Sequence, residues 1–175
     1  MGETATQSTP SNEPPGPRVS RRKLDLRDFD AVAAEVDRLL AHGYDRAGNW
    51  SLAQACDHLS TFMRMSLEGF PLRVPWIISG FLGPLVVKRL TLWTRSIPAG
   101  YKTPQPLEPT SAADDAAAVL TFKDVLQRVW AAAQLHPSPL FGRMTPEQWR
   151  EIHLIHASHH LSFLVPRPAP NEVQQ

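Results

Sequence analysis

Four segments of this 175-residue chain repeat apolar residues at three- and four-residue intervals, and this period limits the fold more than any other feature. The segments cover about 28–41, 51–68, 111–135 and 145–164. No stretch of convincing length alternates apolar and polar residues in the way that a half-buried strand requires. We therefore predict an all-α fold, and four amphipathic helices in one chain are typical of a four-helix bundle.

Capping residues mark the expected starts of these helices. Ser51 has Gln54 three residues on, and Thr145 has Gln148, which is the spacing of a capping box. Ser111 is expected to cap the third helix. In each case a side-chain oxygen can accept a hydrogen bond from a backbone N–H group that the helix itself leaves unpaired.

The connection between the second and third main helices is long and rich in proline. A short apolar helix is expected within residues 76–93, with a break or kink near Gly83 and Pro84. Four prolines between residues 97 and 109 predict an extended crossover. Such a connection usually packs over one end of a bundle, where it can line a pocket.

The two ends of the chain differ from its helical part. Residues 1–22 are mostly Pro, Ser, Thr, Gly and Glu before a short basic run, and they have too few apolar side chains to repay the entropy of ordering. We predict a disordered tail over 1–22, the bundle over 23–165 and a loose tail over 166–175.

Charge and cysteine content narrow the classes of function. The chain has 18 Lys and Arg against 17 Asp and Glu, which gives no basic field for nucleic acid, so no nucleic-acid partner is expected. The single Cys56 excludes an internal disulfide and suits a reducing compartment. The apolar run at 76–87 is shorter than the roughly 20 residues that cross a bilayer, and no apolar signal segment opens the chain. We expect a cytoplasmic protein without a stable membrane anchor.

Four of the seven histidines lie between residues 153 and 160, in the last predicted helix. At about 100° per residue, His153, His156 and His160 fall within about 60° of one another on the helix surface, whereas His159 lies further round. The pair His156 and His160 has the i,i+4 spacing at which two neutral imidazoles can reach one divalent ion. The sequence therefore predicts metal ligands on one face of this helix.

A third ligand has to come from another helix, and His58 in the second helix is the candidate. His153, one turn before His156, is a supporting group behind the ligands, a fourth ligand or a plain surface histidine. Asp57 and Glu151 flank these histidines and are candidates to orient the imidazoles or to accept protons. The alternative is a hydrogen-bonded histidine cluster that titrates near neutrality. The glutamate of H-E-x-x-H is missing, so the spacing is no metalloprotease signature.

Five short blocks of sequence carry a resemblance to a known superfamily. They are Gly48-Asn49-Trp50-Ser51-Leu52, Cys56-Asp57-His58-Leu59, Pro139-Leu140-Phe141-Gly142, Met144-Thr145-Pro146-Glu147-Gln148-Trp149 and His153-x-x-His156-x-x-His159-His160-Leu161. With these blocks the chain resembles the DinB-like superfamily of metal-dependent four-helix bundles over roughly 22–164. Within it, the chain is most similar to an uncharacterised bacterial branch, a domain of unknown function.

The resemblance implies a site of three histidines, which at the matching positions are His58, His156 and His160. It implies a bound divalent ion, with zinc, nickel and manganese all typical of the superfamily. Its members include S-transferases that use bacillithiol or mycothiol, maleylpyruvate-type isomerases and many proteins with no known activity. One departure is that Leu161 follows the last histidine, where this branch often has a glutamine.

Three functions are expected to compete. The first is a metal-dependent transferase or hydrolase that acts on a small molecule, with a low-molecular-weight thiol as the candidate partner. The second is a non-catalytic bundle that binds a metal or a ligand in a stress or regulatory role. The third is a peripheral membrane protein that uses the basic run at 18–23 and the apolar segment at 76–93. Bundles of this kind commonly pair through helix faces, so a homodimer is an open expectation.

Overall fold

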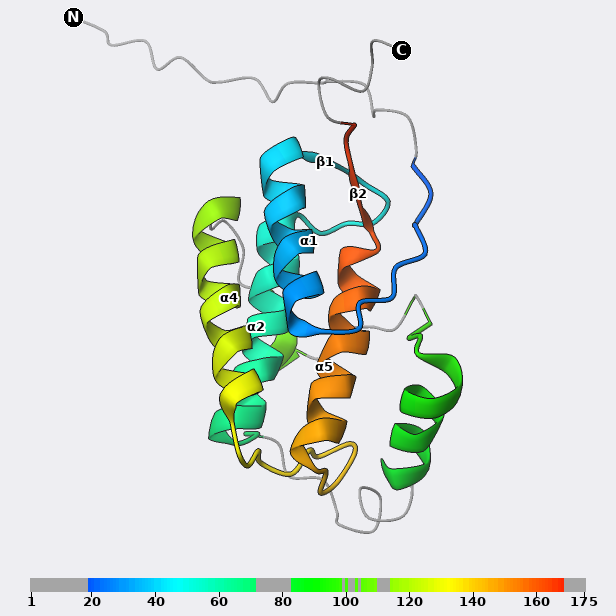
Figure 1. Ribbon diagram of the computed structural model, residues 1–175, viewed down its shortest axis with the longest axis vertical. Coiled ribbons are helices and arrows are strands. Elements are labelled where there is room, and N and C mark those ends of the chain that lie inside the picture. Colours follow the sequence, from blue (N-terminus) through cyan, green and yellow to red (C-terminus); the bar gives the residue numbers. More distant parts are fainter. Residues whose placement is uncertain are drawn as a thin grey trace, which may run out of the picture.

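The protein is mostly helical, with one small two-stranded sheet, in the computed structural model (Figure 1). The structure describes residues 19–71, 83–98, 100, 103, 105–109 and 114–168. The elements are α1 (Phe29–His42), β1 (Tyr44–Arg46), α2 (Leu52–Glu68), the π-helix η1 (Arg89–Thr94), the 3-10 helix η2 (Gln105–Leu107), α4 (Asp115–Ala131), α5 (Pro146–Leu161) and β2 (Leu164–Pro166). The all-helical prediction therefore holds for most of the chain, and the sheet is an addition to it.

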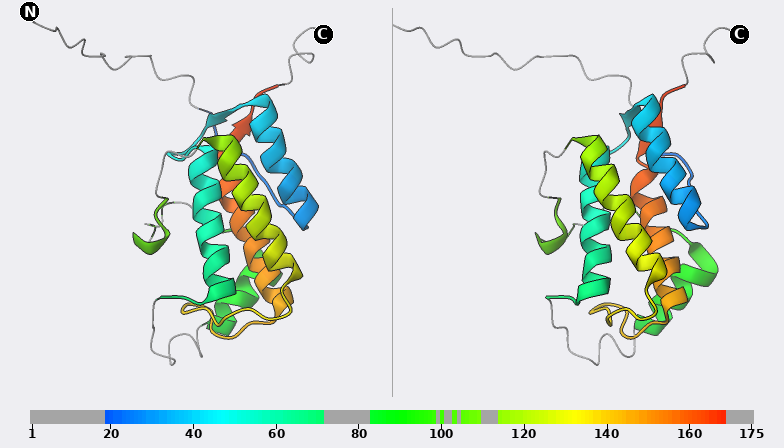
Figure 2. Two further views of the ribbon diagram at one scale, coloured as in Figure 1. Left: turned by 90° about the vertical axis from the view of Figure 1, so that its left-hand side faces the viewer. Right: turned by 60° about the vertical axis from the view of Figure 1, so that its left-hand side comes forward.

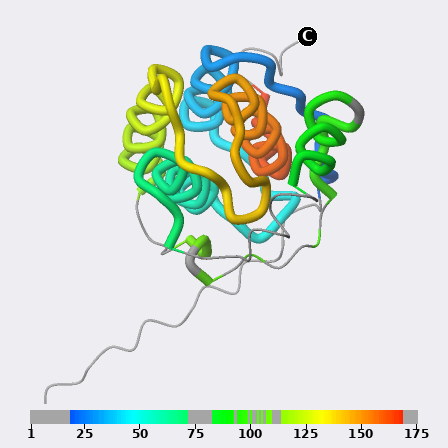
Figure 3. Tube along the Cα trace, turned by 90° about the horizontal axis from the view of Figure 1, so that it is seen from below, coloured from blue at the N-terminus to red at the C-terminus, as the bar shows by residue number. Residues whose placement is uncertain are grey.

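The four long helices α1, α2, α4 and α5 lie side by side (Figures 1 and 2). Each turns an apolar face inward, because its apolar residues recur at helical spacing. The largest fully buried side chains include Val32, Val36 and Leu39 from α1, Leu52, Leu59 and Met63 from α2, Val119 and Phe122 from α4, and Trp149, Ile155 and Leu161 from α5. Seen from below, the four helices are grouped around a common centre (Figure 3).

Two helix starts lie where the sequence predicts them, and one differs. Ser51 and Thr145 each form a complete capping box with the glutamine three residues on. The helix predicted to begin after Ser111 begins at Asp115, and the side chain of Asp114 accepts from the N–H groups of Ala116 and Ala117. Ser111 itself lies outside the described residues.

The small sheet corrects the expectation that no strands form. β1 pairs antiparallel with β2, with Tyr44 opposite Pro166 and Arg46 opposite Leu164. Each strand has only three residues, too few for an alternating pattern to be recognised in the sequence. The sheet also explains why α5 ends at Leu161 and not near Leu164, since Leu164 already belongs to β2. It fixes the loop before α2 against the end of α5.

Residues 19–27, the N-terminal strap, run along α5 (Figure 1). The backbone N–H of Arg22 donates to the carbonyl of Ser162, and the N–H of Leu26 donates to Ser158 Oγ. Residues 19–22, which the sequence assigns to the tail, thus have defined contacts, whereas residues 1–18 lie outside the described part.

The described part of the crossover begins with a helix over 83–88 that continues as η1 and packs beside α5 (Figure 3). A Cβ atom on Gly83 would lie 2.5 Å from the carbonyl oxygen of Phe141, so this close approach of two backbones requires glycine. The first half of the helix expected over 76–93 lies outside the described residues.

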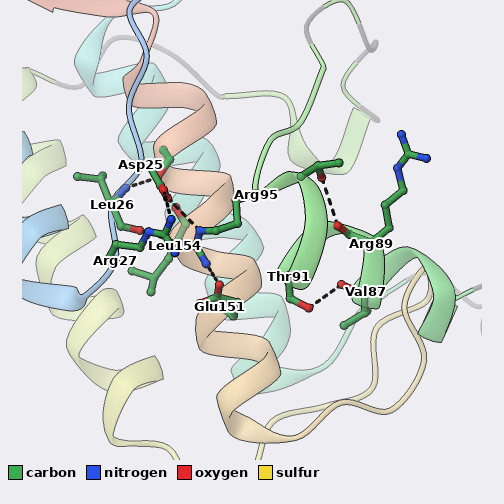
Figure 4. Close-up of polar contacts among 11 residues, drawn as sticks. Asp25, Leu26, Arg27, Val87, Arg89, Thr91, Arg95, Glu151 and Leu154 are labelled. Carbon is green, nitrogen blue, oxygen red and sulfur yellow. Dashed lines mark hydrogen bonds and ion pairs between the residues drawn. The ribbon is translucent and has the colours of Figure 1, made fainter.

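Arg95 ends η1 in the left-handed conformation, with φ 42°. Its guanidinium forms ion pairs with Asp25 of the strap and Glu151 of α5, and it donates to the carbonyl of Leu26 (Figure 4). Arg95 thereby fastens the crossover to two other elements. Among the described residues, none of the helices has the length and apolar content needed to cross a membrane.

Candidate metal centre

His58 of α2 and the pair His156 and His160 of α5 converge in the interior. One ligand nitrogen from each ring lies within 4.8 Å of the other two. His156 Nε2 is 3.1 Å from His58 Nε2 and 3.0 Å from His160 Nε2. The structure therefore brings together the three histidines that the sequence predicts as ligands.

Aromatic side chains pack against all three of these rings. The Trp50 indole stacks on His160, with ring centroids 5.0 Å apart and planes 13° apart, and it also contacts His58 at 4.9 Å. The ring of Phe62, one turn after His58 on α2, lies edge-on to His156 at 4.9 Å. Trp50 directly precedes the Ser51 cap, so the start of α2 also sets one wall of the site.

The tautomer of His58 is fixed by the crossover. His58 Nδ1–H donates to the backbone carbonyl of Leu107, at 2.6 Å, because a carbonyl can only accept. The lone pair of His58 then lies on Nε2, which faces the other two histidines. A ligand histidine commonly donates its second ring N–H to a carbonyl in this way, which orients the ring and raises its basicity.

Hydrogen bonding alone does not satisfy the cluster. His58 Nε2 has no proton to give, so a hydrogen bond in either short contact needs a hydrogen on His156 Nε2 or on His160 Nε2. Such a hydrogen satisfies only one of the two contacts, because both contacts share His156 Nε2. A divalent ion, in contrast, accepts one lone pair from each of the three rings. The donor set therefore fits a metal ion better than it fits a network of imidazoles.

The surroundings keep the three rings in the neutral form that binds metal. Burial lowers the pKa of His58 below its usual range and that of His160 to about 2. Burial, together with the neighbouring histidines, holds the pKa of His156 well below its usual range. A neutral imidazole is the ligand form, so no proton has to leave before an ion binds at neutral pH.

His153 is not part of the three-histidine group. The residue is 2% exposed, and its ring stacks on Trp149 with centroids 5.2 Å apart. His153 Nε2 lies 3.1 Å from Ser66 Oγ, whose own hydrogen goes to the carbonyl of Met63. The expectation of a plain surface histidine is therefore wrong, and these contacts pack His153 into the interior one turn below the candidate ligands.

The two candidate carboxylates have different surroundings. Glu151 forms an ion pair with Arg95, and its carboxylate therefore lies on the strap side of α5 (Figure 4). Asp57 adjoins His58 in sequence, and its charge opposes the lowering of the His58 pKa by burial. Glu151 is therefore committed to fastening the crossover, and its partner Arg95 could not be foreseen from the sequence.

A cavity of about 230 Å³ opens beside the three histidines. Its walls include Phe62 and Ile152 from the long helices, Leu90, Ile97 and Leu107 from the crossover, and Phe141 from the turn before α5. No carboxylate, lysine, arginine or cysteine lies among its described lining residues. The cavity can therefore admit a small, mostly apolar group next to a bound ion.

Cys56 and His159 lie in different surroundings, one in the core and the other at the cavity. Cys56 is fully buried in the core, and burial raises the pKa of its thiol, as expected for a cysteine that acts as a small apolar side chain. His159, which lies further round the helix than the other three histidines, is on a wall of the cavity with Nδ1 2.9 Å from the carbonyl of Ile97. The role of the Leu107 carbonyl was missed, because a backbone acceptor leaves no sequence signal.

Comparison with known proteins identifies the family. A family described as "Protein of unknown function (DUF1569)" matches residues 18–167, so the chain belongs to it. Searches among curated proteins and among solved structures found no match.

Proposed function

We propose that this member of the family binds one divalent metal ion through His58, His156 and His160 and acts on a small molecule at the open side of that ion. The convergence of three ring nitrogens within 4.8 Å supports this most directly. Three protein ligands leave at least one coordination position for water or substrate, as catalytic sites require.

We further assign the chain to the DinB-like superfamily, as a four-helix bundle with a long crossover. In support, α2 supplies one histidine and the last helix supplies an i,i+4 pair. The crossover contributes a carbonyl to His58 and part of the cavity wall.

The reaction we favour is transfer of a low-molecular-weight thiol to a small molecule, or hydrolysis of that small molecule by water. A bound zinc, nickel or manganese ion would supply the activation, by lowering the pKa of a coordinated water or by holding a thiol as thiolate. The chain would hold the ion through neutral imidazoles and place mostly apolar walls beside it. Because no carboxylate lines the cavity in the described part, an ion-activated nucleophile suits the site better than one activated by a side-chain base.

The same lack of a lining carboxylate favours a second candidate, a bundle that binds a metal or ligand without turnover. Both candidates need the three histidines, and they differ in whether a substrate enters the open position.

Co²⁺ loading tests the open position. In the Co²⁺ protein we expect a visible absorption band that changes when a small thiol is added, because thiolate coordination adds a charge-transfer band. His58→Ala should lose both signals, whereas the exposed His42→Ala should keep them. A Co²⁺ spectrum that no thiol alters would contradict the thiol proposal, and turnover with a panel of electrophiles would separate the enzyme from the non-catalytic bundle.

A further inference from the structure

A second cavity, of about 420 Å³, lies between the N-terminal strap and α5. Its lining includes four basic side chains and three serines, which are Arg21, Arg22, Lys23, Arg95, Ser96, Ser158 and Ser162. It shares Ile97, Ile155 and His159 with the cavity beside the three histidines. The contact between His159 Nδ1 and the carbonyl of Ile97 therefore lies in a wall that the two cavities have in common.

Two of the four basic side chains are already paired with carboxylates. Arg22 forms an ion pair with the buried Glu35. Arg95 pairs with Asp25 and Glu151 (Figure 4). These two arginines shape the cavity, and their charges are balanced locally.

Arg21 and Lys23 have no carboxylate partner in the part of the chain that the structure describes. Arg21 is nevertheless held in place, because its Nε donates to Ser162 Oγ at 2.7 Å and its guanidinium lies 4.4 Å from the centre of the Phe163 ring. A guanidinium that is fixed in this way loses little entropy when it binds an oxyanion, and its forked N–H groups match carboxylate and phosphate oxygens.

The charge of Arg21 also reaches the candidate metal ligands. Arg21 Nη2 lies 3.2 Å from Nδ1 of His159, which directly precedes His160 in the chain. A divalent ion held by neutral histidines would add two further positive charges. No acidic residue lines either cavity in the described part, so nothing in the two linings balances this charge.

We propose that the strap cavity binds the carboxylate or phosphate group of a small anion through Arg21 and Lys23, with the rest of the molecule directed past His159 toward the three histidines. The direction toward the ion rests on the proposed metal function, whereas oxyanion binding by Arg21 and Lys23 does not. The substrate class this implies is a small molecule with an oxyanion at one end and a reactive, less polar group at the other.

The test titrates inorganic phosphate and succinate separately into metal-free and Zn²⁺-loaded protein, with binding followed by calorimetry and by amide NMR shifts. We expect at least one of the two anions to bind metal-free wild type, with shifts concentrated at residues 21–23 and 158–162. Arg21→Gln/Lys23→Gln should weaken binding about tenfold. The control Lys123→Gln/Arg128→Gln removes two exposed positive charges from α4 and should leave binding unchanged.

The two anions distinguish a phosphate ligand from a carboxylate ligand. Failure of both to bind, or equal weakening in the α4 control, would overturn the proposal, since bulk charge would then explain the effect. If the metal-free protein binds an anion but the protein takes up no Zn²⁺, the oxyanion site stands and the proposed metal function is refuted. Tighter binding after Zn²⁺ loading would support the link between the two cavities.

Discussion

His153 and His160 lie on one helix but have different surroundings. His160 takes part in the group of three ring nitrogens, whereas His153 is buried between Trp149 and Ser66. Its spacing from His156 therefore gave no way to tell a ligand from a packed histidine. The sequence does distinguish His58, His156 and His160 as a set, but only the fold shows that His153 has Ser66 as a neighbour.

Replacing His153 separates these roles. His153→Ala should lower the free energy of unfolding by about 2–4 kcal/mol, because it removes a buried ring and leaves a cavity. It should leave the metal content unchanged. Urea unfolding together with metal analysis measures both effects, and loss of metal from a folded His153→Ala protein would make His153 a fourth ligand.

Buried histidines also predict how stability depends on pH in metal-free protein. The folded pKa values of His153, about 3, and His160, about 2, lie below the usual 6.5, so below pH 6.5 the unfolded chain binds protons that the folded chain does not. The free energy of unfolding should have its full value above pH 6.5. Below pH 6.5 it should fall by about 1.4 kcal/mol per pH unit for each such histidine. Urea unfolding across this range checks the slope, and a free energy that stays constant down to about pH 5 would contradict it.

One side chain, Arg95, joins the described crossover to two other elements. Helix 83–88 and η1 have exposed apolar residues, including Leu85 and Leu92, so apolar burial alone does not fix them. Arg95 does so through Asp25 and Glu151 (Figure 4). The crossover in turn supplies Leu90 and Ile97 to the wall of the cavity beside the histidines.

Changes at Arg95 should loosen this element. Arg95→Ala is expected to destabilise the protein by about 1–3 kcal/mol, since it removes a largely buried guanidinium from two carboxylates. Arg95→Gly should cost about 1 kcal/mol less than Arg95→Ala, because glycine adopts the left-handed backbone without strain.

Hydrogen exchange provides the matching measurement. Amides of 83–98 should exchange faster in both Arg95 variants, whereas Arg27→Ala should change little, since Arg27 is exposed and pairs only with Asp25 among the described residues. Unchanged exchange over 83–98 in Arg95→Ala would show that other contacts hold the crossover.

Sequence patterns predicted the elements better than their connections. The capping boxes at Ser51 and Thr145 are local, so the sequence contains all of the information that they need. The three-residue strands and the ion pair of Arg95 with Glu151 depend on residues far apart in the chain. Such contacts leave no periodic signal, and the crossover and the strap were for that reason the least predictable parts.

Across the whole molecule, the fold brings together His58 and His156, which are 98 residues apart in the sequence. It also places two cavities beside the same part of α5. One cavity adjoins the three histidines and is mostly apolar, and the other is basic. Together they favour a ligand with an anionic end and a less polar end, next to a divalent ion.

Metal content tests the three-histidine site most directly. Purified wild type is reconstituted with Zn²⁺, Ni²⁺ or Mn²⁺, and unbound metal is removed. It should then hold about one equivalent of metal, measured by inductively coupled plasma mass spectrometry. His58→Ala and His156→Ala/His160→Ala should hold none while remaining folded, and His42→Ala should match wild type. A wild type that retains no metal after reconstitution, or variants that retain as much as wild type, would contradict the site.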